Sequence, residues 1–360
     1  TSARSRDRAP LPAVLKGAAI GCGFFAQHHI EAWRRMPEVE IVAAADPRLD
    51  RAEKFASRAY RSAEEMLDRE SLDFVDIVTR SECHLPLLRL ATGKGIPVIC
   101  QKPIAPDWAT ALAIVEIAES AHVPLMVHEN WRWQPWYRLA HEMLIRGDIG
   151  PPIGYGFRTR ARDGIGDQPY PEQTYFRDLR QFIIGEVLVH HIDTARFLFG
   201  DIDSIFAQTS RWNPNIAAED QAILVLIHKA GVHGWIDGHR FLAPDPDGPV
   251  MGDAFFEGEL GTISILGTGD VYRNNVRVWK NDIASGYRGD SVRATQSHFV
   301  SCLKNGRPFE SAGRTYLRTF AAVEAAYRSV TERRCVSLGE VLAATAGKNG
   351  CGSDSALPRK

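Results

Sequence analysis

A glycine-rich turn between a short apolar run and an amphipathic segment is the feature that most constrains this chain. The run 17–20 reads as a buried strand, and Gly21-Cys22-Gly23-Phe24-Phe25-Ala26 follows it directly. Gly21 permits a tight turn from strand to helix, and Gly23 lets the backbone approach a pyrophosphate group at the helix N-terminus. Small residues at a strand end also serve ordinary packing, so the pattern predicts a dinucleotide site only together with its surroundings. The loop residues that we assign to the cofactor are Gly21, Gly23, Phe24 and Phe25.

A second apolar run ends in an acidic residue at a distance typical of dinucleotide-binding proteins. The run 40–45 leads to Asp46, which lies roughly 20 residues after Gly23. An Asp at this point accepts hydrogen bonds from the adenosine ribose, and it favours NAD because the 2′-phosphate of NADP would meet a like charge. Arg48 keeps NADP open as an alternative, because its guanidinium could receive that phosphate. An Asp that begins a turn before Pro47 is the ordinary alternative.

The alternation of strands and helices continues to about residue 130. We expect helices over 52–59, 63–69, 84–92 and 108–121, and strands over 74–78, 97–100 and 124–128. Strands separated by single helices form a parallel sheet through right-handed crossovers, which predicts a doubly wound α/β (Rossmann) fold. Ligands of such folds lie at the carboxyl ends of the strands. The residues near these ends that we assign to the cofactor are Asp46, Thr79, His84, Gln101 and Lys102.

Beyond Pro135 the pattern changes to strand-like runs. These runs cover 155–162, 204–212, 222–228, 232–239 and 255–266, with a hairpin turn expected at 229–231. They predict a second domain with a mostly antiparallel open sheet, one face of which needs a cover, and a helix over 315–330 that packs back on the first domain. We expect a homodimer or a homotetramer. The expected divisions are a disordered tail over 1–12, a first domain over 13–135, a second domain over 136–340 and a tail over 341–360.

The bulk composition favours a small-molecule partner. The formal net charge of −1 implies no overall attraction to nucleic acid or to an anionic membrane. The six cysteines are scattered and form no CxxC pair or Cys/His cluster, which favours a reduced, cytoplasmic setting and no metal. No apolar run approaches the roughly 20 residues that cross a bilayer. The N-terminus carries arginines but no apolar core of a secretory signal.

A lysine stands just past a predicted strand at the expected cofactor edge. The stretch is Cys100-Gln101-Lys102-Pro103. A lysine held there can hydrogen-bond a substrate hydroxyl and stabilise the alkoxide that forms as hydride departs. The alternative is a solvated lysine before a turn-forming proline.

A carboxylate and an imidazole lie four residues apart on a predicted helix. Glu186 and His190 share one face of that helix, so the carboxylate could orient the imidazole, and the imidazole could take a proton near neutral pH. A histidine on an apolar helix face is more often a core residue, and His191 fits that alternative better than His190.

The glycine loop, the Lys-Pro at a strand end and the carboxylate-x-x-x-His-x-x-Asp helix, in this order, resemble the glucose–fructose oxidoreductase/inositol dehydrogenase/MocA family. The resemblance covers about residues 14–338 and includes the hairpin-like stretch 257–262. Within the family, the stretches 21–26, 100–103 and 128–134 look closest to D-apiose dehydrogenase-like sugar dehydrogenases. The resemblance implies an NAD(P)-dependent oxidoreductase that oxidises a secondary or anomeric hydroxyl of a sugar or polyol. By motif, it implies Lys102 as the catalytic lysine, Glu186 as the helix carboxylate, His190 as the acid/base and Asp193 as a further site carboxylate.

Two positions depart from the family pattern. Gln101 stands where the family usually has Glu, which keeps a hydrogen bond and loses a charge next to Lys102. Glu186 stands where Asp is usual, which moves the carboxylate outward by about one methylene group.

Residues after the last expected strand complete the predicted substrate site. We assign to the substrate Lys102, Asn130, Arg132, Trp133, His190 and Asp193. Packing at the domain junction is an equally good account of the tryptophans. Two other functions stay open on the same fold: a glycosidase that uses NAD transiently, and a dinucleotide sensor without turnover. The presence of both Lys102 and His190 argues against the sensor, which needs neither.

Overall fold

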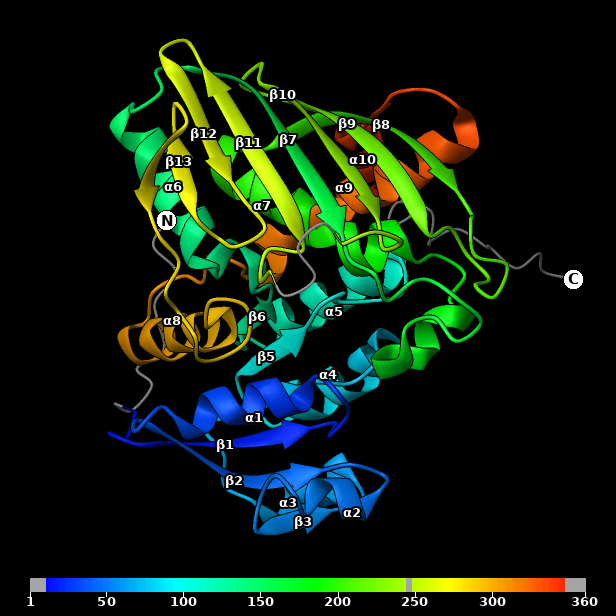
Figure 1. The fold of residues 1–360 in the computed structure, drawn as a ribbon. Helices are drawn as coiled ribbons and strands as arrows, with labels where there is room; N and C mark the ends of the chain where they lie inside the picture. The colour runs from blue at the N-terminus through cyan, green and yellow to red at the C-terminus, as the bar shows by residue number, and fades with distance from the viewer. Residues whose placement is uncertain (1–10, 244–247, 347–360) are drawn as a thin grey trace, which may run out of the picture.

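The computed structural model describes residues 11–243 and 248–346. Two sheets organise this part of the chain, and they are stacked one above the other in Figure 1. The parts of the expected tails at 1–10 and 347–360 lie outside the described residues.

The first sheet has six parallel strands in the order β3-β2-β1-β4-β5-β6. The strands are β1 (Leu15–Ile20), β2 (Val39–Ala45), β3 (Arg58–Tyr60), β4 (Phe74–Ile77), β5 (Val98–Gln101) and β6 (Leu125–His128). The helices between them are α1 (Ala26–Arg34), α2 (Leu49–Ala52), α3 (Ala63–Arg69), η1 (Ser81–Cys83), α4 (His84–Gly93) and α5 (Trp108–Ser120). The strand order reverses between β1 and β4, and ligands of doubly wound folds bind at such a switch point. The predicted Rossmann fold is confirmed.

The prediction of a helix over 52–59 is wrong. Helix α2 ends at Ala52, and the chain forms strand β3 from Arg58. The reason is tertiary, because β2 offers an unpaired edge on which residues 43–45 pair with 58–60. Phe55 meanwhile packs on the apolar cluster behind the sheet. A short amphipathic run therefore ended as an edge strand.

The second sheet has nine strands in the order β14-β13-β12-β11-β7-β10-β9-β8-β15, and only the β7–β10 pair is parallel. Its strands are β7 (Pro152–Arg160), β8 (Ile202–Ser210), β9 (Gln221–His228), β10 (His233–His239), β11 (Gly252–Gly258), β12 (Gly261–Ile265), β13 (Val271–Arg273), β14 (Val276–Trp279) and β15 (Val336–Ser337). The hairpin around 229–231 is confirmed as the β9–β10 turn. The stretch expected as strand over 255–266 folds as the hairpin β11–β12.

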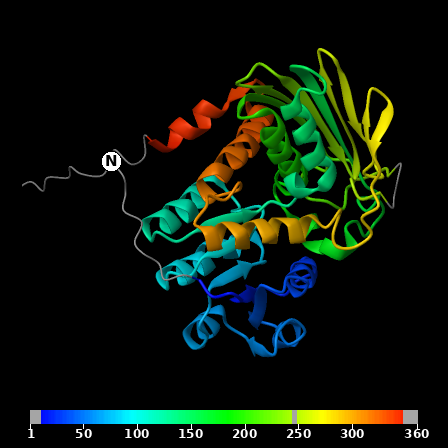
Figure 2. The same cartoon turned by 90° about the vertical axis from the view of Figure 1, so that its left-hand side faces the viewer.

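Helices cover one face of this larger sheet. They are α6 (Pro135–Arg146), α7 (Val189–Phe199) and α9 (Gly313–Glu332), and they lie on the side turned toward the first sheet (Figures 1 and 2). Along β9, Leu224 and Leu226 are buried, whereas Ile223 and Val225 are 49% and 42% exposed on the other face. The alternation that one covered face requires is therefore present.

Two long helices from the second half of the chain pack on the first sheet and its helices. As expected for the stretch 315–330, α9 packs back on the first part of the chain, where Phe320 stacks on Trp108 and Arg314 pairs with Glu119. Helix α8 (Ser291–Asn305), which the sequence pattern did not predict, packs on α1 and β6. The last described helix, α10 (Leu338–Ala346), includes residues 341–346, so that part of the expected C-terminal tail is helical. Within the described ranges no helix is long and apolar enough to cross a membrane.

Candidate active site

The two loop glycines differ in what surrounds them. Gly21 has a φ of +91°, and a Cβ there would lie 2.6 Å from the Thr79 side chain and 2.7 Å from the Val78 carbonyl oxygen. A Cβ on Gly23 would have no protein atom within 4 Å. Gly21 is therefore required by the fold itself, whereas Gly23 opens onto free space at the start of α1, where a pyrophosphate fits.

Asp46 ties the glycine loop to the end of β2. Its carboxylate accepts the Cys22 N–H at 2.8 Å and the Arg48 N–H at 2.9 Å. Each oxygen keeps a lone pair that could accept a ribose hydroxyl. The Arg48 guanidinium lies 3.1 Å from the Asp50 carboxylate, so the group that could receive a 2′-phosphate is already paired. This arrangement favours NAD over NADP.

Thr79 and His84 follow the carboxyl end of β4, next to this loop. Thr79 borders Gly21, and it is partly exposed. His84 is fully buried, and its ring nitrogens face the main-chain oxygens of Ile104 and Thr79. Burial lowers the pKa of His84. The structure thus places His84 behind the rim, where it supports Thr79 and has no exposed atoms for a cofactor.

Lys102 and Glu186 meet across the two sheets. The Lys102 Nζ donates to the Glu186 carbonyl oxygen at 2.7 Å, and it lies 3.3 Å from the Glu186 carboxylate. Glu186 belongs to a short π-helix, η4 (Ile183–Leu188), immediately before α7. Such irregular turns are frequent at functional sites. Burial raises the pKa of Glu186, and the nearby Lys102 opposes that shift.

His190 takes its carboxylate partner from the first sheet. Its Nδ1 lies 2.5 Å from the Oε1 of Glu129, which directly follows β6. The expectation that Glu186 orients His190 is therefore corrected: Glu186 contacts Lys102, and Glu129 contacts His190. The Trp131 ring stacks on the His190 ring at 4.8 Å and 8°, which fixes the plane of the imidazole.

Burial controls the protonation of this pair. It lowers the pKa of His190 well below its usual value, and Lys102 adds to that shift. It also raises the pKa of Glu129 to about 8, with Asp193 as the next cause. Glu129 had no assigned role in the sequence. The available signal was its position at the carboxyl end of a parallel strand.

The other residues assigned to the substrate are engaged in packing. Asp193 is fully buried and accepts two hydrogen bonds from Arg132, both at 2.7 Å, and one from Thr319 at 2.8 Å. The Asn130 side chain donates to Ser291 at 2.8 Å. The Trp133 ring is covered by the Arg138 guanidinium. The packing alternative, which was offered for the tryptophans, fits Trp133, and the hydrogen bonds of Asn130, Arg132 and Asp193 place these side chains behind the site as well.

Gln101 and the neighbouring loops complete the surroundings of the site. The Gln101 side chain accepts the Lys102 N–H at 2.6 Å. Tyr287, just before α8, packs on Phe25 at 5.2 Å and on His28 at 4.6 Å, so it reaches the glycine loop. Across residues 11–243 and 248–346, no group of three or more His, Cys, Asp or Glu side chains is placed to hold a metal ion.

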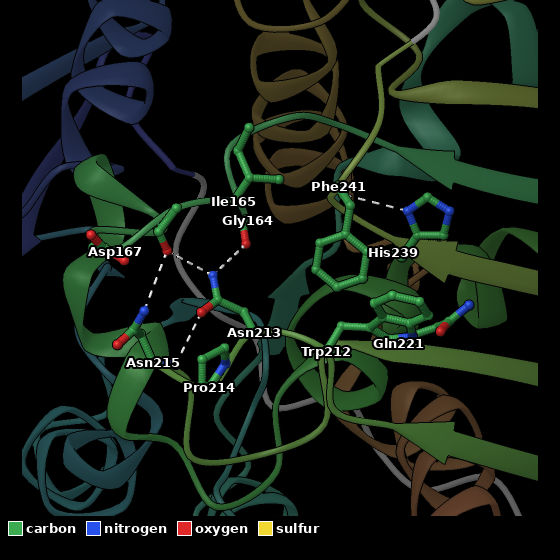
Figure 3. Close-up of a pocket in the computed structure, with 11 residues that line it drawn as sticks. Gly164, Ile165, Asp167, Trp212, Asn213, Pro214, Asn215, Gln221, His239 and Phe241 are labelled. Carbon is green, nitrogen blue, oxygen red and sulfur yellow. Dashed lines mark hydrogen bonds between the residues drawn. The ribbon is translucent and has the colours of Figure 1, made fainter.

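A separate cavity of about 570 Å³ lies at one end of the larger sheet (Figure 3). The rings of Trp212, His239 and Phe241 line one side of it, and Asn213 and Asn215 line the other. Its remaining lining residues are Gly164, Ile165, Gly166, Asp167, Pro214 and Gln221. The residues of the Lys102 cluster do not line it, so this cavity is distinct from the candidate active site.

Two family models match the chain, one over the first sheet and one over much of the second. Residues 15–129 match the family described as "Oxidoreductase family, NAD-binding Rossmann fold". Residues 137–265 match the family described as "GFO/IDH/MocA C-terminal domain".

Several whole-length relatives are similar to the chain. A D-apiose dehydrogenase from Paraburkholderia graminis is 37% identical, with 90% of each chain covered. A D-apiose dehydrogenase from Rhizobium rhizogenes is 34% identical, over 91% of this chain and 99% of the relative. An oxidoreductase from Agrobacterium radiobacter, crystallised with NAD+, L-tartaric acid and magnesium, is 33% identical, over 91% of this chain and 99% of that one, with a TM-score of 0.83.

Proposed function

The chain belongs to the GFO/IDH/MocA family of NAD-binding oxidoreductases, and on that premise we propose that it oxidises a secondary or anomeric hydroxyl of a sugar or polyol. One observation carries the proposal: the Lys102–Glu186 pair and the Glu129–His190 pair lie close enough to interact electrostatically, at the carboxyl end of the parallel sheet. This is the place where a doubly wound fold presents its ligand.

Residues of the first sheet hold the cofactor. The backbone of the loop 21–25 receives the pyrophosphate at the start of α1, and Asp46 receives the adenosine ribose. Thr79, Gln101 and Lys102 border the nicotinamide end. When bound, NAD supplies the hydride acceptor.

His190 acts as the general base. Its Nδ1–H is donated to the Glu129 carboxylate, which leaves Nε2 free to take the proton of the substrate hydroxyl. Burial disfavours the imidazolium form of the ring, so Nε2 is a free acceptor once Glu129 is ionised. Glu129 stabilises the positive charge that develops on the ring during that transfer.

Lys102 stabilises the negative charge that develops on the substrate oxygen. Its ammonium group is held by two oxygens of Glu186, so one of its three N–H bonds remains for the substrate. The Glu186 carboxylate is the counter-ion of that ammonium. Asn130, Arg132, Trp133 and Asp193 form the supporting wall behind these groups.

The substrate class follows the relatives, two of which are D-apiose dehydrogenases. Branched and linear pentoses are therefore the first compounds to test. The test is NADH absorbance after mixing the protein and NAD with D-apiose, other pentoses, hexoses and inositols. Net NADH formation with a free sugar supports the dehydrogenase. Release of sugar from a glycoside without net NADH would instead support the NAD-using glycosidase, and NAD binding without either reaction would support the sensor.

We further propose a cytoplasmic homodimer or homotetramer that divides at about residue 135 into the two domains expected from the sequence. Apolar side chains on the uncovered face of the larger sheet, among them Phe206, Ile223 and Val225, support an interface between copies. The cysteines within the described residues are all free, which agrees with a reducing compartment.

A further inference from the structure

A chain of buried polar groups lies directly beneath Lys102. Asp76 on β4 and His29 on α1 are both 0% exposed, and the His29 Nδ1 lies 2.8 Å from the Asp76 carboxylate. The same carboxylate oxygen accepts the Trp33 indole N–H at 2.7 Å. The His29 Nε2 lies 3.2 Å from the Gln101 side-chain nitrogen, and the Gln101 oxygen lies 2.6 Å from the Lys102 main-chain nitrogen.

The hydrogen bond from the Lys102 main-chain N–H fixes the orientation of the Gln101 side-chain amide. A main-chain N–H can only donate, so the Gln101 atom that faces the Lys102 nitrogen must be the amide oxygen. The amide NH₂ group then faces the His29 Nε2 and can only donate to it.

The Gln101 amide also fixes the tautomer of His29. Because Nε2 accepts a hydrogen bond from Gln101, the imidazole proton must be on Nδ1, where it is donated to Asp76. The hydrogen bonds therefore run in one direction, from the Lys102 N–H through Gln101 and His29 to the Asp76 carboxylate.

We propose that Asp76 and His29 are positioning residues that require an amide at position 101 and, through that amide, hold the main chain of Lys102. A carboxylate at position 101 offers no donor to the neutral His29 ring. Glu186 is then the carboxylate with which the Lys102 ammonium pairs. This inference rests on the role proposed for Lys102, but the tautomer of His29 can be measured without any turnover.

The substitution Gln101→Glu tests whether position 101 must donate a hydrogen bond to His29. The introduced carboxylate accepts the Lys102 N–H, and it can bind the His29 Nε2 only if that nitrogen gains a proton. His29 is then an imidazolium between two carboxylates, a state that is lost when the ring gives up that proton at high pH. The other titratable groups that face His29 are His128, whose ring lies at 4.0 Å, and the adjacent His28. Burial lowers the pKa of both rings.

The first experiment is ¹⁵N NMR of the protein with labelled histidine, with the His29 signals identified by their loss in His29→Gln. The expected result is a neutral ring with the proton on Nδ1. A proton on Nε2, with or without one on Nδ1, would overturn the inference. In Gln101→Glu the same signals should become those of an imidazolium.

The second experiment compares the pH dependence of kcat. The ratio of the Gln101→Glu rate to the wild-type rate should fall by about tenfold or more from about pH 6 to about pH 9, because the variant loses its imidazolium bridge. The double variant Gln101→Glu/His29→Gln should show a flat ratio, since it has no histidine to titrate. Gln208→Glu is the control for the same chemical change at an exposed position of β8, and its ratio should not change with pH.

Two outcomes separate the hypotheses. A flat ratio for Gln101→Glu, with Tm and NAD affinity retained, would contradict the positioning role. Absence of NADH formation by the wild-type protein with every sugar would contradict the proposed function, while the NMR result would still decide the tautomer.

Discussion

The Nδ1 of His190 lies 2.5 Å from the Oε1 of Glu129, although the two residues are attached to different sheets. Glu129 follows the last strand of the six-stranded sheet, and His190 lies in the first turn of α7 beneath the nine-stranded sheet. The proposed base is therefore assembled only when these two parts of the chain are packed together.

The ionisation of this pair should be visible in the pH dependence of oxidation. Below the Glu129 pKa of about 8 the pair holds one more proton, so the His190 Nε2 is not free to accept another. We therefore expect kcat/KM for oxidation to rise with pH through about 8. Glu129→Gln should remove this limb and lower kcat by about 10- to 100-fold, because the amide accepts the Nδ1–H without a charge. If kcat/KM of that variant still rises with pH in the same way, the ionisation belongs to another group.

Removal of the lysine should separate chemistry from cofactor binding. Lys102→Ala is expected to lower kcat by about 10²- to 10³-fold, because the charge on the substrate oxygen loses its donor. NAD affinity, measured by fluorescence titration, should stay nearly unchanged. Lys94→Ala is the control, since Lys94 pairs with Asp68 at the surface and should leave both values intact. Normal turnover of the Lys102 variant would remove Lys102 from the mechanism.

The two loop glycines should respond differently to a methyl group. Gly21→Ala should lower the free energy of unfolding by about 2 kcal/mol or more, because φ is +91° and the Cβ would meet Thr79 and Val78. Gly23→Ala should leave the unfolding curve nearly unchanged, since its Cβ meets no protein atom, and should weaken NAD binding by about tenfold or more. Urea unfolding and NAD titration measure the two effects. Equal NAD affinity of the Gly23 variant and the wild type would place the pyrophosphate elsewhere.

Cofactor choice should depend on Asp46 and on the partner of Arg48. Asp46→Ala is expected to weaken NAD binding by about tenfold, the equivalent of roughly 1.4 kcal/mol, with little change in kcat. Asp50→Ala frees the Arg48 guanidinium and should raise kcat/KM for NADP relative to NAD. Steady-state rates with both cofactors decide the matter. No change in the NADP to NAD ratio for the Asp50 variant would show that Arg48 does not reach the 2′-phosphate.

The uncovered sheet face should hold the copies together. Ile223→Glu with Val225→Glu places two charges on that face and should shift the protein to monomers in light scattering. Ile145→Glu, at an exposed position on α6, serves as the control for an added charge alone. If the double variant keeps the mass of the wild type, the interface is on another surface.

The fold could be predicted further than the site. The alternation to residue 128 was informative because strands buried on both faces read as continuous apolar runs, and Val98 to Cys100 is such a run. The segment 52–59 failed because an open edge beside β2 decided its structure, and local periodicity does not record such an edge. Helix α8 was missed because its buried face includes polar side chains such as Ser291, Thr295 and Gln296.

The members of the site could be named from the sequence, but their pairing could not. Lys102, Glu186 and His190 were expected, and the helix spacing suggested that Glu186 serves His190. The structure shows that both partners come from distant segments instead. Lys102 and Glu186 are 84 residues apart in the chain, and Glu129 and His190 are 61 residues apart. Such partners are set by the packing of two sheets, which spacing along one helix does not report.

Both of these contacts span the junction between the sheets, whereas the glycine loop and Asp46 lie within the smaller sheet and its connections. A small separation of the sheets would deprive the base of its carboxylate and the lysine of its counter-ion in one movement, and the cofactor site would remain whole. Binding of the cofactor thus depends on the smaller sheet alone, whereas the chemical step depends on the contact between the two sheets.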